Sequence, residues 1–298
     1  MQQEFEMSLL GELTFLGSQL QQAKYGIFLS QEKYLKEILK KYGMEDYNPM
    51  STPIVTKCNL SSHDYSRMVN QPMYRYMIGS LPNLTGTRPD IMHAVGIVGK
   101  FQANPKESHL QTVKIIIKHL QGTQYFGLWY PKNFDLTLHA YTYVDWAGNV
   151  DDHKSTSGGA FYMGSRLVSW FSTKQSSIAL STSPEEYVVV ASCFTELLWV
   201  MHTLQDIQIK FSPSISILCD NTSAISISIN PVMHSKTEHI PIKYHFLREQ
   251  VLEKMVKLEY VPLKEQVADI FTKPLPWESF EYLRQKLGVV STSLIKSV

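Results

Sequence analysis

The sequence predicts an α/β protein of the α+β kind, with a mixed sheet flanked by helices in its second half. A mainly helical region with an N-terminal β-hairpin is expected before that sheet. From about residue 136, the segments follow in the order three meandering strands, helix, strand, helices, strand and helix, which is typical of a mixed sheet covered by helices. Before that point, apolar residues recur mostly at helical spacing. The 298 residues suffice for two domains, which we expect to be residues 1–130 and 131–298.

Composition places the chain among globular proteins. Its residues are 44% hydrophobic and 18% charged, which allows a sizeable core. The formal net charge of +1 gives no global electrostatic argument for nucleic acid, so such an argument has to be local. Cys58, Cys193 and Cys219 are far apart and form neither a zinc-type pair nor a disulfide framework, which fits a reducing compartment. No apolar run of membrane length and no signal peptide is evident, so we expect neither membrane association nor secretion.

The first expected elements are a hairpin and a helix. Residues 13–16 and 25–29 are β-rich and should pair across a polar, Gln-rich turn. Ser30 should cap a helix that ends at Gly43. A connector rich in Pro, Ser and Asn follows over 44–70.

Two further helical stretches complete the first half. Residues 72–101 have helical spacing with a break at Arg88-Pro-Asp90. Pro82 stands inside this pattern, where a proline costs about 3 kcal/mol, so the helix either breaks there or is destabilised. The next helix should take Asn104 as its N-cap and Pro105 as its first residue, and should end before Gly122.

The second half alternates between strands and helices. A turn at Gly164-Ser165 should join the second and third strands. The expected strands cover 136–144, 159–162, 167–171, 215–219 and 258–261, and the expected helices cover 183–205, a short stretch from Asn221, 240–255, and segments around Asp269 and Phe280.

Four carboxylates stand where strands end or helices begin. Asp145 ends the first strand, Asp220 follows an apolar strand, Glu186 lies in the first turn of a helix, and Asp269 opens a late helical segment. Sites in α/β sheets form at the carboxyl ends of strands. Glu186 and Asp269 could equally be present only to complement helix dipoles. If the four gather, their repulsion calls for cations, and two Mg²⁺ ions (or Mn²⁺) would activate water and stabilise the leaving oxygen of a phosphodiester.

Short motifs in order along nearly the whole chain resemble the Pol polyproteins of copia-type retrotransposons. The first group resembles the late part of a reverse transcriptase: Gly11-Glu-Leu-Thr-Phe-Leu-Gly17, Gly26-Ile-Phe-Leu-Ser-Gln31, Ser51-Thr-Pro53, Tyr74-Arg-Tyr-Met-Ile-Gly79, Arg88-Pro-Asp90 and Asn104-Pro-Lys106. The second group resembles a ribonuclease H domain: Asp145-Trp-Ala-Gly148, Lys154-Ser-Thr-Ser-Gly158, Ala179-Leu-Ser-Thr182, Cys219-Asp-Asn221, His234-Ser-Lys-Thr237, Tyr244-His-Phe246 and Ala268-Asp-Ile-Phe-Thr-Lys273.

The resemblance implies a transposable-element fragment with two parts. Residues 1–130 would be the palm end, thumb and connection of a reverse transcriptase; no Tyr-x-Asp-Asp polymerase loop occurs, so the chain is not expected to polymerise. Residues 131–298 would be a ribonuclease H-like hydrolase, an endonuclease that cuts RNA in an RNA–DNA hybrid with two Mg²⁺ ions (or Mn²⁺). Glu186, Asp220 and Asp269 match the second, third and fourth metal-binding carboxylates of that family. The implied partners are the hybrid and the rest of a Pol polyprotein, in the cytoplasm (in the virus-like particle of an active element) or the nucleus.

The first carboxylate departs from the family pattern Asp-x-Asp-Trp-Ala-Gly. Tyr143 stands at the first Asp, and Asp145 matches the second. Asp145 faces the same side of a strand but lies ~6.5 Å further along, and a neutral phenol is a poor Mg²⁺ ligand. Ser183-Pro-Glu-Glu-Tyr187 and Pro82 are further departures. We therefore hypothesise that hydrolysis is severely weakened or lost; the alternatives are a non-catalytic nucleic-acid-binding remnant of a degenerate element and a purely structural module.

Several side chains are candidates for contacts with nucleic acid. Lys154, Arg166 and Lys174 could contact phosphates, although a solvated basic surface explains them equally well. Asn221 and His239 could also bind the hybrid, with an ordinary surface or core-edge role as the alternative for the histidine. Trp146, Trp170 and Trp199 are expected in the core rather than as stacking platforms. No base lies near Ser181 or the cysteines in sequence, so no nucleophilic triad is predicted.

Overall fold

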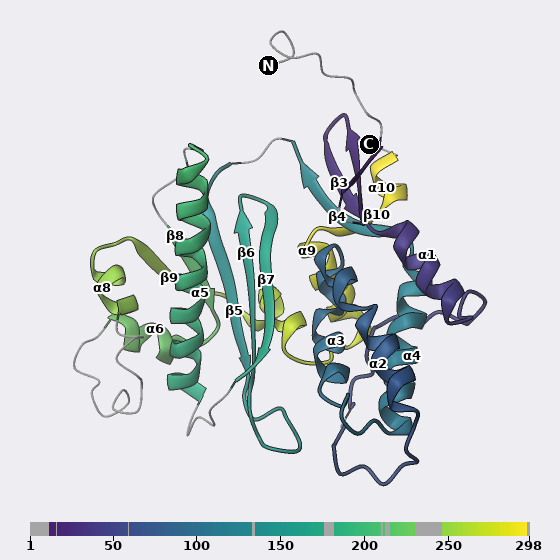
Figure 1. Cartoon of the computed structure of the whole chain (residues 1–298). Helices are drawn as coiled ribbons and strands as arrows, with labels where there is room; N and C mark the ends of the chain where they lie inside the picture. Colours follow the sequence, from purple (N-terminus) through teal and green to yellow (C-terminus); the bar gives the residue numbers. More distant parts are fainter. Residues whose placement is uncertain are drawn as a thin grey trace.

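The computed structural model describes residues 12–15, 17–58, 60–132, 135–175, 182–209, 211, 215–229 and 246–296 (Figure 1). In this part of the chain the strands form two five-stranded sheets. The strands are β1 Glu12–Phe15, β2 Ser18–Ala23, β3 Gly26–Ser30, β4 Phe126–Pro131, β5 Leu138–Asp145, β6 Thr156–Met163, β7 Arg166–Lys174, β8 Ile215–Cys219, β9 Val256–Tyr260 and β10 Val289–Ser291. The helices are α1 Glu32–Lys41, α2 Gln71–Gly79, η1 Pro82–Gly86, η2 Pro89–Ile91, α3 Met92–Gly99, α4 Glu107–Gly122, α5 Thr182–Asp206, α6 Thr222–Ile229, α8 Phe246–Leu252, η4 Leu263–Glu265, η5 Val267–Phe271, α9 Trp277–Lys286 and α10 Thr292–Lys296.

The second sheet has the strand order β7-β6-β5-β8-β9. Its three meandering strands pair antiparallel, whereas β8 and β9 join them in parallel. Parallel pairing requires crossovers, and these run through α5 and through the segment that contains α6 and α8. The predicted α+β fold with a mixed sheet flanked by helices is confirmed, including the turn at Gly164, where φ is +60°.

Helix α5 runs across one face of this sheet (Figure 1). Its apolar side packs with the buried residues of β5 and β8 in one core cluster, in which Tyr187, Phe194, Leu197, Ala140 and Ile217 are at most 1% exposed. By length and composition, Glu185–Asp206 is also long and apolar enough to cross a membrane. The expectation that the chain has no apolar run of membrane length is therefore wrong for this helix. Here that apolarity serves the core between helix and sheet.

The first sheet has the order β1-β2-β3-β4-β10 and differs from the expected hairpin. The Gln-rich stretch forms strand β2 rather than a turn. The turn between β1 and β2 lies at Gly17, whose φ of +79° favours glycine. Gln19 is 5% exposed, so β2 buries polar side chains that a pattern of apolar residues does not reveal. Ser30 ends β3 instead of capping α1, for which Gln31 is the N-cap.

The last strand of the first sheet comes from the C-terminal end of the described chain. β10 pairs antiparallel with β4, so the chain returns to the first sheet after completing the second. A core cluster joins both halves there, with Leu128, Tyr162, Phe271, Phe280 and Val289 among its buried residues. The expected domain boundary at residue 130 stays a prediction. Strand β10, which lies far beyond this boundary in the sequence, nevertheless belongs to the first sheet.

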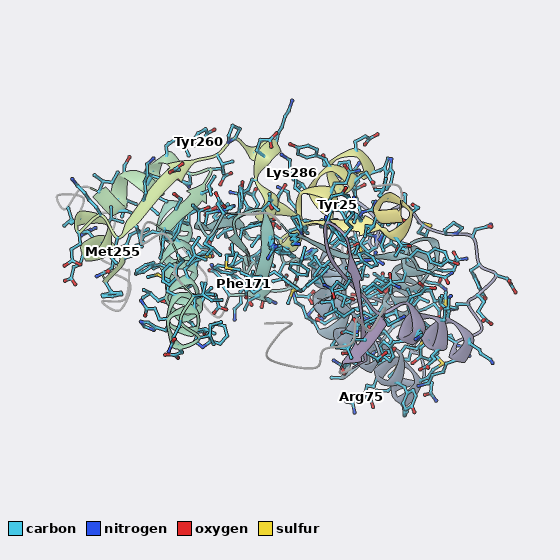
Figure 2. All side chains as sticks on the ribbon, turned by 90° about the horizontal axis from the view of Figure 1, so that it is seen from above. Tyr25, Arg75, Phe171, Met255, Tyr260 and Lys286 are labelled. Atoms are coloured by element: carbon cyan, nitrogen blue, oxygen red, sulfur yellow. The ribbon has the colours of Figure 1, made fainter. Side chains whose placement is uncertain are left out.

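The helices of the first half pack around a separate core cluster in which Tyr74, Leu81 and Val113 are fully buried. Seen from above, Arg75 on α2 and Met255 beside β9 lie at opposite ends of the molecule, with Phe171 of β7 between them (Figure 2). Pro82 begins the short 3₁₀ helix η1, so the helix does break there and the proline occupies a tolerated first position. Helix α4 begins at Glu107, later than the cap predicted at Asn104, with Lys106 as N-cap.

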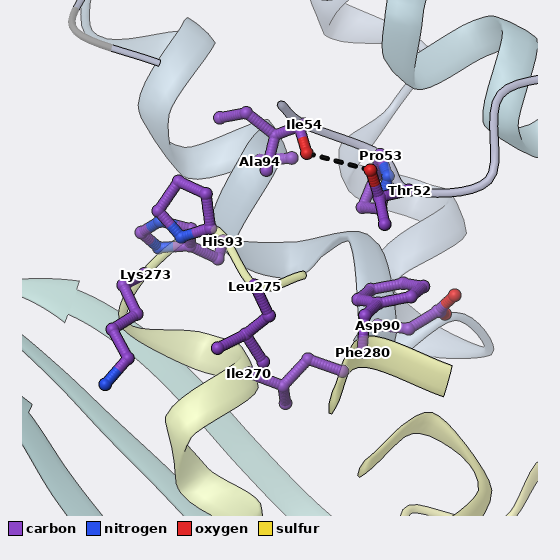
Figure 3. A pocket seen from close by; sticks show the side chains of 11 residues that line it. Thr52, Pro53, Ile54, Asp90, His93, Ala94, Ile270, Lys273, Leu275 and Phe280 are labelled. Carbon is purple, nitrogen blue, oxygen red and sulfur yellow. Dashed lines mark hydrogen bonds between the residues drawn. The ribbon is translucent and has the colours of Figure 1, made fainter. Parts of the chain in front are cut away.

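The two halves meet where α3 packs against η5 and the segment before α9 (Figure 3). His93 and Ala94 of α3, Ile270 of η5, and Leu275 line a small pocket at this junction. Lys273 also lines it, but its side chain extends away towards the strands of the second sheet (Figure 3). This junction therefore fixes the segment that carries Asp269 and Lys273.

Candidate metal centre

The predicted carboxylates come from four elements that meet at one end of the second sheet. Asp145 ends β5, Asp220 follows β8, Glu186 lies in the first turns of α5, and Asp269 lies in the 3₁₀ helix η5. Because β5 and β8 are parallel neighbours, their carboxyl ends lie at the same edge of the sheet. A cleft of about 470 Å³ opens there, lined by Tyr143, Val144, Asp145, Trp146, Glu186, Asp220, Asn221 and Thr222.

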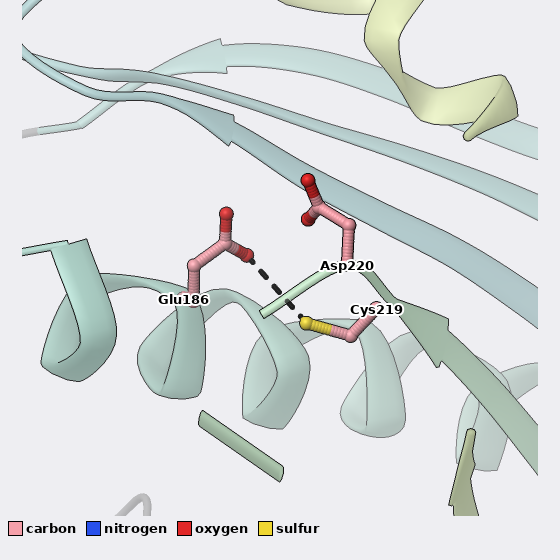
Figure 4. Close-up of side chains that lie close together, drawn as sticks. All are labelled: Glu186, Cys219 and Asp220. Carbon is pink, nitrogen blue, oxygen red and sulfur yellow. Dashed lines mark hydrogen bonds between the residues drawn. The ribbon is translucent and has the colours of Figure 1, made fainter. Parts of the chain in front are cut away.

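Glu186 and Asp220 line the cleft, and Cys219 lies close to both of them (Figure 4). Their ligand atoms, including the Cys219 Sγ, all lie within 4.8 Å of one another. The backbone N–H of Val144 donates to Glu186 Oε1 at 3.2 Å, and the Cys219 thiol donates weakly to Oε2 at 4.0 Å. Burial, and then the charge of Asp220, raise the pKa of Glu186 to about 8. A carboxyl pair that resists double ionisation in this way is one that a cation would stabilise.

Asp269 lies outside the group formed by Glu186, Cys219 and Asp220 and is paired with a lysine. Asp269 is 6% exposed. Lys273 follows it by four residues in the sequence, and the Lys273 Nζ lies 2.7 Å from the Asp269 Oδ1. The same ammonium donates to the Tyr143 hydroxyl at 3.0 Å and lies 4.5 Å from the centroid of that ring. Burial raises the pKa of Asp269, Lys273 opposes this rise, and the charges of Asp145 and Asp220 add to it. All four carboxylates thus belong to one electrostatic cluster, with Lys273 and Tyr143 inside it.

Asp145 shares the strand face of Tyr143, as the alternation predicts. Tyr143 and Asp145 are half-buried, whereas Thr142 and Val144, on either side of Tyr143 in the sequence, are buried on the opposite face. The Asp145 carboxylate folds towards the turn after β5, where it occupies the space that a Cβ on Gly148 would need. Burial raises its pKa and Lys273 lowers it. Asp145 therefore lies at the edge of the cluster, and the Tyr143 side chain stands at the position nearer Asp269 and Lys273.

The residues fit a divalent ion at one half of this cluster and not at the other. Around Glu186 and Asp220 they offer hard oxygen donors, and one Asp220 carboxylate oxygen is buried with no hydrogen-bond partner among the described residues. Beside Asp269, the neighbouring side chains are a phenol instead of a carboxylate and an ammonium that is already paired with Asp269. Burial raises the pKa of the Tyr143 hydroxyl, so the phenol is neutral and a weak ligand.

Gly158 of β6 is what allows η5 to bring Asp269 so close to the sheet. A Cβ at this position would lie 2.7 Å from the Ala268 carbonyl oxygen and 2.8 Å from both Phe271 Cβ and Thr272 Cγ2. We expect Gly158→Ala to lower the free energy of unfolding by about 1–3 kcal/mol, because backbone and packed side chains have to move apart. Urea unfolding would measure it, with Gly86→Ala as control because nothing lies within 4 Å of a Cβ there. Equal stability of the two variants would show that η5 is not held by this contact.

The residues predicted to bind nucleic acid are only partly gathered here. Asn221 lines the cleft and caps α6 by accepting from the Ala224 N–H. Lys174 lies at the same end of the sheet, since Asp145 pairs with Thr156 and Thr156 with Lys174. Its Nζ is 2.8 Å from Asp152 Oδ2, and Lys154 is half-buried in the adjoining turn.

Arg166 lies away from this cleft, and its contact with nucleic acid stays a prediction. The register places it opposite Met163 and Leu138, at the far end of the sheet. There its guanidinium donates to the carbonyl oxygens of Pro131 and Lys132. His239 lies outside the described residues, as do the motifs at 179–181 and 234–237.

Two tryptophans expected in the core are exposed. Trp146 is 50% exposed and lines the cleft, and Trp199 on α5 is 61% exposed. The residue that sequence reasoning missed as a member of the site is Lys273. Its spacing of four residues from Asp269 was a usable signal, but its contact with Tyr143 spans 130 residues of sequence and only the fold reveals it.

Comparison with known proteins adds three findings. Models of known protein families give no match. The retrovirus-related Pol polyprotein from transposon RE1 of Arabidopsis thaliana is 37% identical over 275 residues, which are 92% of this chain and 19% of that polyprotein. The corresponding polyprotein from transposon TNT 1-94 of Nicotiana tabacum is 34% identical over 273 residues, 89% of this chain and 20% of its own length. The N-terminal ribonuclease H domain of a Mycobacterium tuberculosis protein, solved as a fusion with maltose-binding protein, matches with a TM-score of 0.34 and 11% identity over 51% of this chain and 98% of that one.

The chain spans about a fifth of the length of the curated relatives it matches. Its similarity to them extends over both sheets, because about nine-tenths of the chain is aligned.

Proposed function

The chain belongs to the copia-type, retrovirus-related Pol polyproteins of transposons, and from this premise we propose that its second half is a ribonuclease H that hydrolyses RNA in an RNA–DNA hybrid, at a rate that Tyr143 lowers severely. The first half would be the end of the reverse transcriptase that precedes such a domain. The observation that carries the proposal is the convergence of Glu186, Asp220 and Asp269 at the carboxyl ends of the parallel strands β5 and β8. These three carboxylates match the family's metal-binding positions residue by residue.

Glu186 and Asp220 would hold the divalent ion, with Mg²⁺ or Mn²⁺ suited to their oxygen donors. Such an ion, when bound, supplies Lewis acidity and a more acidic water for attack on a phosphodiester. The Val144 N–H fixes the Glu186 carboxylate, and the rigid ends of β8 and α6 fix Asp220 between them. Asp269, which would complete the set, is instead engaged by Lys273.

The rim of the cleft suits a nucleic-acid substrate. The exposed ring of Trp146 offers a flat surface on which a base or sugar can pack. Lys154 and Lys174, on the neighbouring edge, would supply the phosphate contacts that a chain of net charge +1 needs locally. The Lys174 ion pair with Asp152 is partly exposed, so a phosphate can compete for it.

A second candidate is a remnant that binds the hybrid without cutting it. The observation that favours it is the Tyr143–Lys273 pair, which fills the place of the first carboxylate while leaving the rim intact. Whether the domain cuts the hybrid or only binds it, we propose that in an intact element it is part of a longer Pol polyprotein. This polyprotein would be located in the cytoplasm, within a virus-like particle, or in the nucleus.

Cleavage of labelled RNA in an RNA–DNA hybrid, with Mg²⁺ or Mn²⁺, tests both candidates. We expect slow cleavage that is specific for the hybrid over RNA duplex, stops on chelation, and falls at least about 100-fold in Glu186→Gln. Glu196→Gln is the matched control, since Glu196 lies on the same helix and contacts Ser169 away from the cleft.

The binding measurement separates the remaining outcomes. Hybrid affinity that falls steeply with salt, with no cleavage by the wild-type chain, would favour the remnant. Cleavage that persists in Glu186→Gln would contradict the proposed site.

A further inference from the structure

We propose that Lys273, held by Tyr143, is a built-in cation that takes the place of one divalent ion, so that this chain binds at most one such ion, between Glu186 and Asp220. The inference rests on the proposed function, because it concerns the same carboxylates. It goes beyond that function in assigning to a side chain the charge that metal ions would supply.

The contacts hold the ammonium firmly inside the cluster. Lys273 Nζ lies 2.7 Å from Asp269 Oδ1 and 3.0 Å from the Tyr143 hydroxyl oxygen, and the Tyr143 ring lies 4.5 Å from it. A carboxylate, a hydroxyl and the negative face of a ring are three groups that attract a cation. The Lys273 side chain is 28% exposed and its Asp269 partner 8%, so water screens this pair less than a surface pair.

The charge of Lys273 also reaches the other carboxylates. It lowers the pKa of Asp145 and of Asp220, in each case against the effect of burial. Of the two other lysines at the same end of the sheet, Lys174 is paired instead with Asp152, and the backbone N–H of Lys154 donates to the same Asp152. Lys273 is therefore the basic residue that neutralises Asp269 and its neighbours in the described part of the chain.

A divalent ion beside Asp269 would meet two obstacles. It would face the ammonium as a like charge within a few ångströms, and it would find a neutral phenol where a carboxylate is needed. At Glu186 and Asp220 these obstacles are weaker, since Lys273 forms its ion pair with Asp269 and the ligand atoms of Glu186, Asp220 and Cys219 lie within 4.8 Å of one another. The charge of Lys273 and the neutral phenol of Tyr143 thus oppose a divalent ion beside Asp269. The Glu186–Asp220 half of the cluster remains able to bind one.

The same pair would make the Asp269 half of the cluster independent of metal. Clustered carboxylates destabilise a protein unless a positive charge is near, and at Asp269 the chain supplies one. We expect any rise in the melting temperature of the wild-type chain with Mg²⁺ to come from the Glu186–Asp220 half and to be lost in Glu186→Gln.

Mn²⁺ titration of the full chain without nucleic acid, followed by electron paramagnetic resonance, tests the inference. The wild type should bind no more than one ion at the site, lost in Glu186→Gln. Lys273→Gln keeps a side chain that can hydrogen-bond to Asp269 and Tyr143 but removes the charge, so it should bind Mn²⁺ at least about tenfold more tightly or take a second ion. Its melting temperature in chelator should fall, and Mn²⁺ should restore it.

Lys257→Gln is the matched control, because Lys257 forms an exposed ion pair with Glu259 on β9, outside the cleft. Tyr143→Phe, which loses only the hydroxyl, is the second variant and should shift Mn²⁺ affinity in the same direction by less. Two ions in the wild type, or Mn²⁺ affinity unchanged in both Lys273→Gln and Tyr143→Phe, would overturn the inference. Since these readouts need no substrate, stronger Mn²⁺ binding in variants that never cleave hybrid would support the inference while contradicting the proposed hydrolase.

Discussion

Tyr143→Asp is expected to raise the rate of RNA cleavage in an RNA–DNA hybrid at least about tenfold, which corresponds to ~1.4 kcal/mol of transition-state stabilisation. The substitution places a carboxylate on the strand face that points at Asp269 and removes the hydroxyl that accepts from Lys273. Single-turnover cleavage with Mn²⁺ and Mg²⁺ measures the effect. Asp145 is a poor substitute, because its carboxylate is turned towards Gly148.

Tyr141→Asp is the matched control for that experiment. Tyr141 is the neighbouring half-buried tyrosine on the same face of β5, two residues further from the cleft, where it lies against Tyr162. It should not gain activity, and Tyr143→Asp combined with Glu186→Gln should lose whatever Tyr143→Asp gained. Robust cleavage by the wild type that Tyr143→Asp leaves unchanged and Asp145→Asn abolishes would instead make Asp145 the ligand.

If Lys273 competes with a metal ion, its charge should limit this gain. The double variant Tyr143→Asp with Lys273→Gln should then bind Mn²⁺ more tightly than Tyr143→Asp alone, since the new carboxylate otherwise forms a further ion pair with the ammonium.

Arg88→Met should lower the free energy of unfolding by about 3–5 kcal/mol, because it leaves a buried carboxylate without its partner. Arg88 is 2% exposed, and its Nε and Nη2 donate to the two Asp90 oxygens at 2.9 and 2.8 Å. It also donates to the Thr123 carbonyl oxygen at 3.0 Å and to the Thr123 hydroxyl at 2.9 Å. His119 Nε2 lies 3.6 Å from the same carboxylate. Burial tends to raise the pKa of Asp90, but Arg88 and His119 outweigh it and hold the pKa well below its usual value.

Urea unfolding of the full chain measures this loss. Arg75→Met is the control, since Arg75 is exposed and donates only to the Gln102 carbonyl oxygen among its described contacts. Arg88→Met with Asp90→Leu should recover part of the loss, because it removes the orphaned charge as well. A loss of less than about 1 kcal/mol in Arg88→Met would mean that water or a local rearrangement compensates Asp90.

The elements of the second sheet could be predicted because their signals are local. Alternation marked β5, two short runs joined by the Gly164-Ser165 turn marked β6 and β7, an apolar run marked β8, and helical spacing marked α5 almost to its ends. The errors fell where local signals are weak or mixed. Strand β2 carries glutamines, β10 has only three residues, and the cap at Lys106 is not a residue type that usually begins a helix.

The candidate site was predictable in its residues and less so in its geometry. Glu186, Asp220 and Asp269 follow from motif and position, and the register of parallel strands explains why they meet. That Arg166 lies at the opposite end of the sheet from Lys174 follows only from the strand register. The exposure of Trp146 and Trp199 likewise depends on what packs over them, which composition does not reveal.

The fold class, the resemblance to Pol polyproteins and the match of Tyr143 to an Asp of the family pattern can all be read from the chain without coordinates. Periodicity, motifs and residue identity are properties of neighbouring positions. The contact of Lys273 with Tyr143 across 130 residues, its pairing with Asp269, and the closure of the first sheet by β10 appear only once the chain is folded. Those contacts depend on how β5 and η5 pack together, with Gly158 allowing their close approach, and no local pattern encodes that distance.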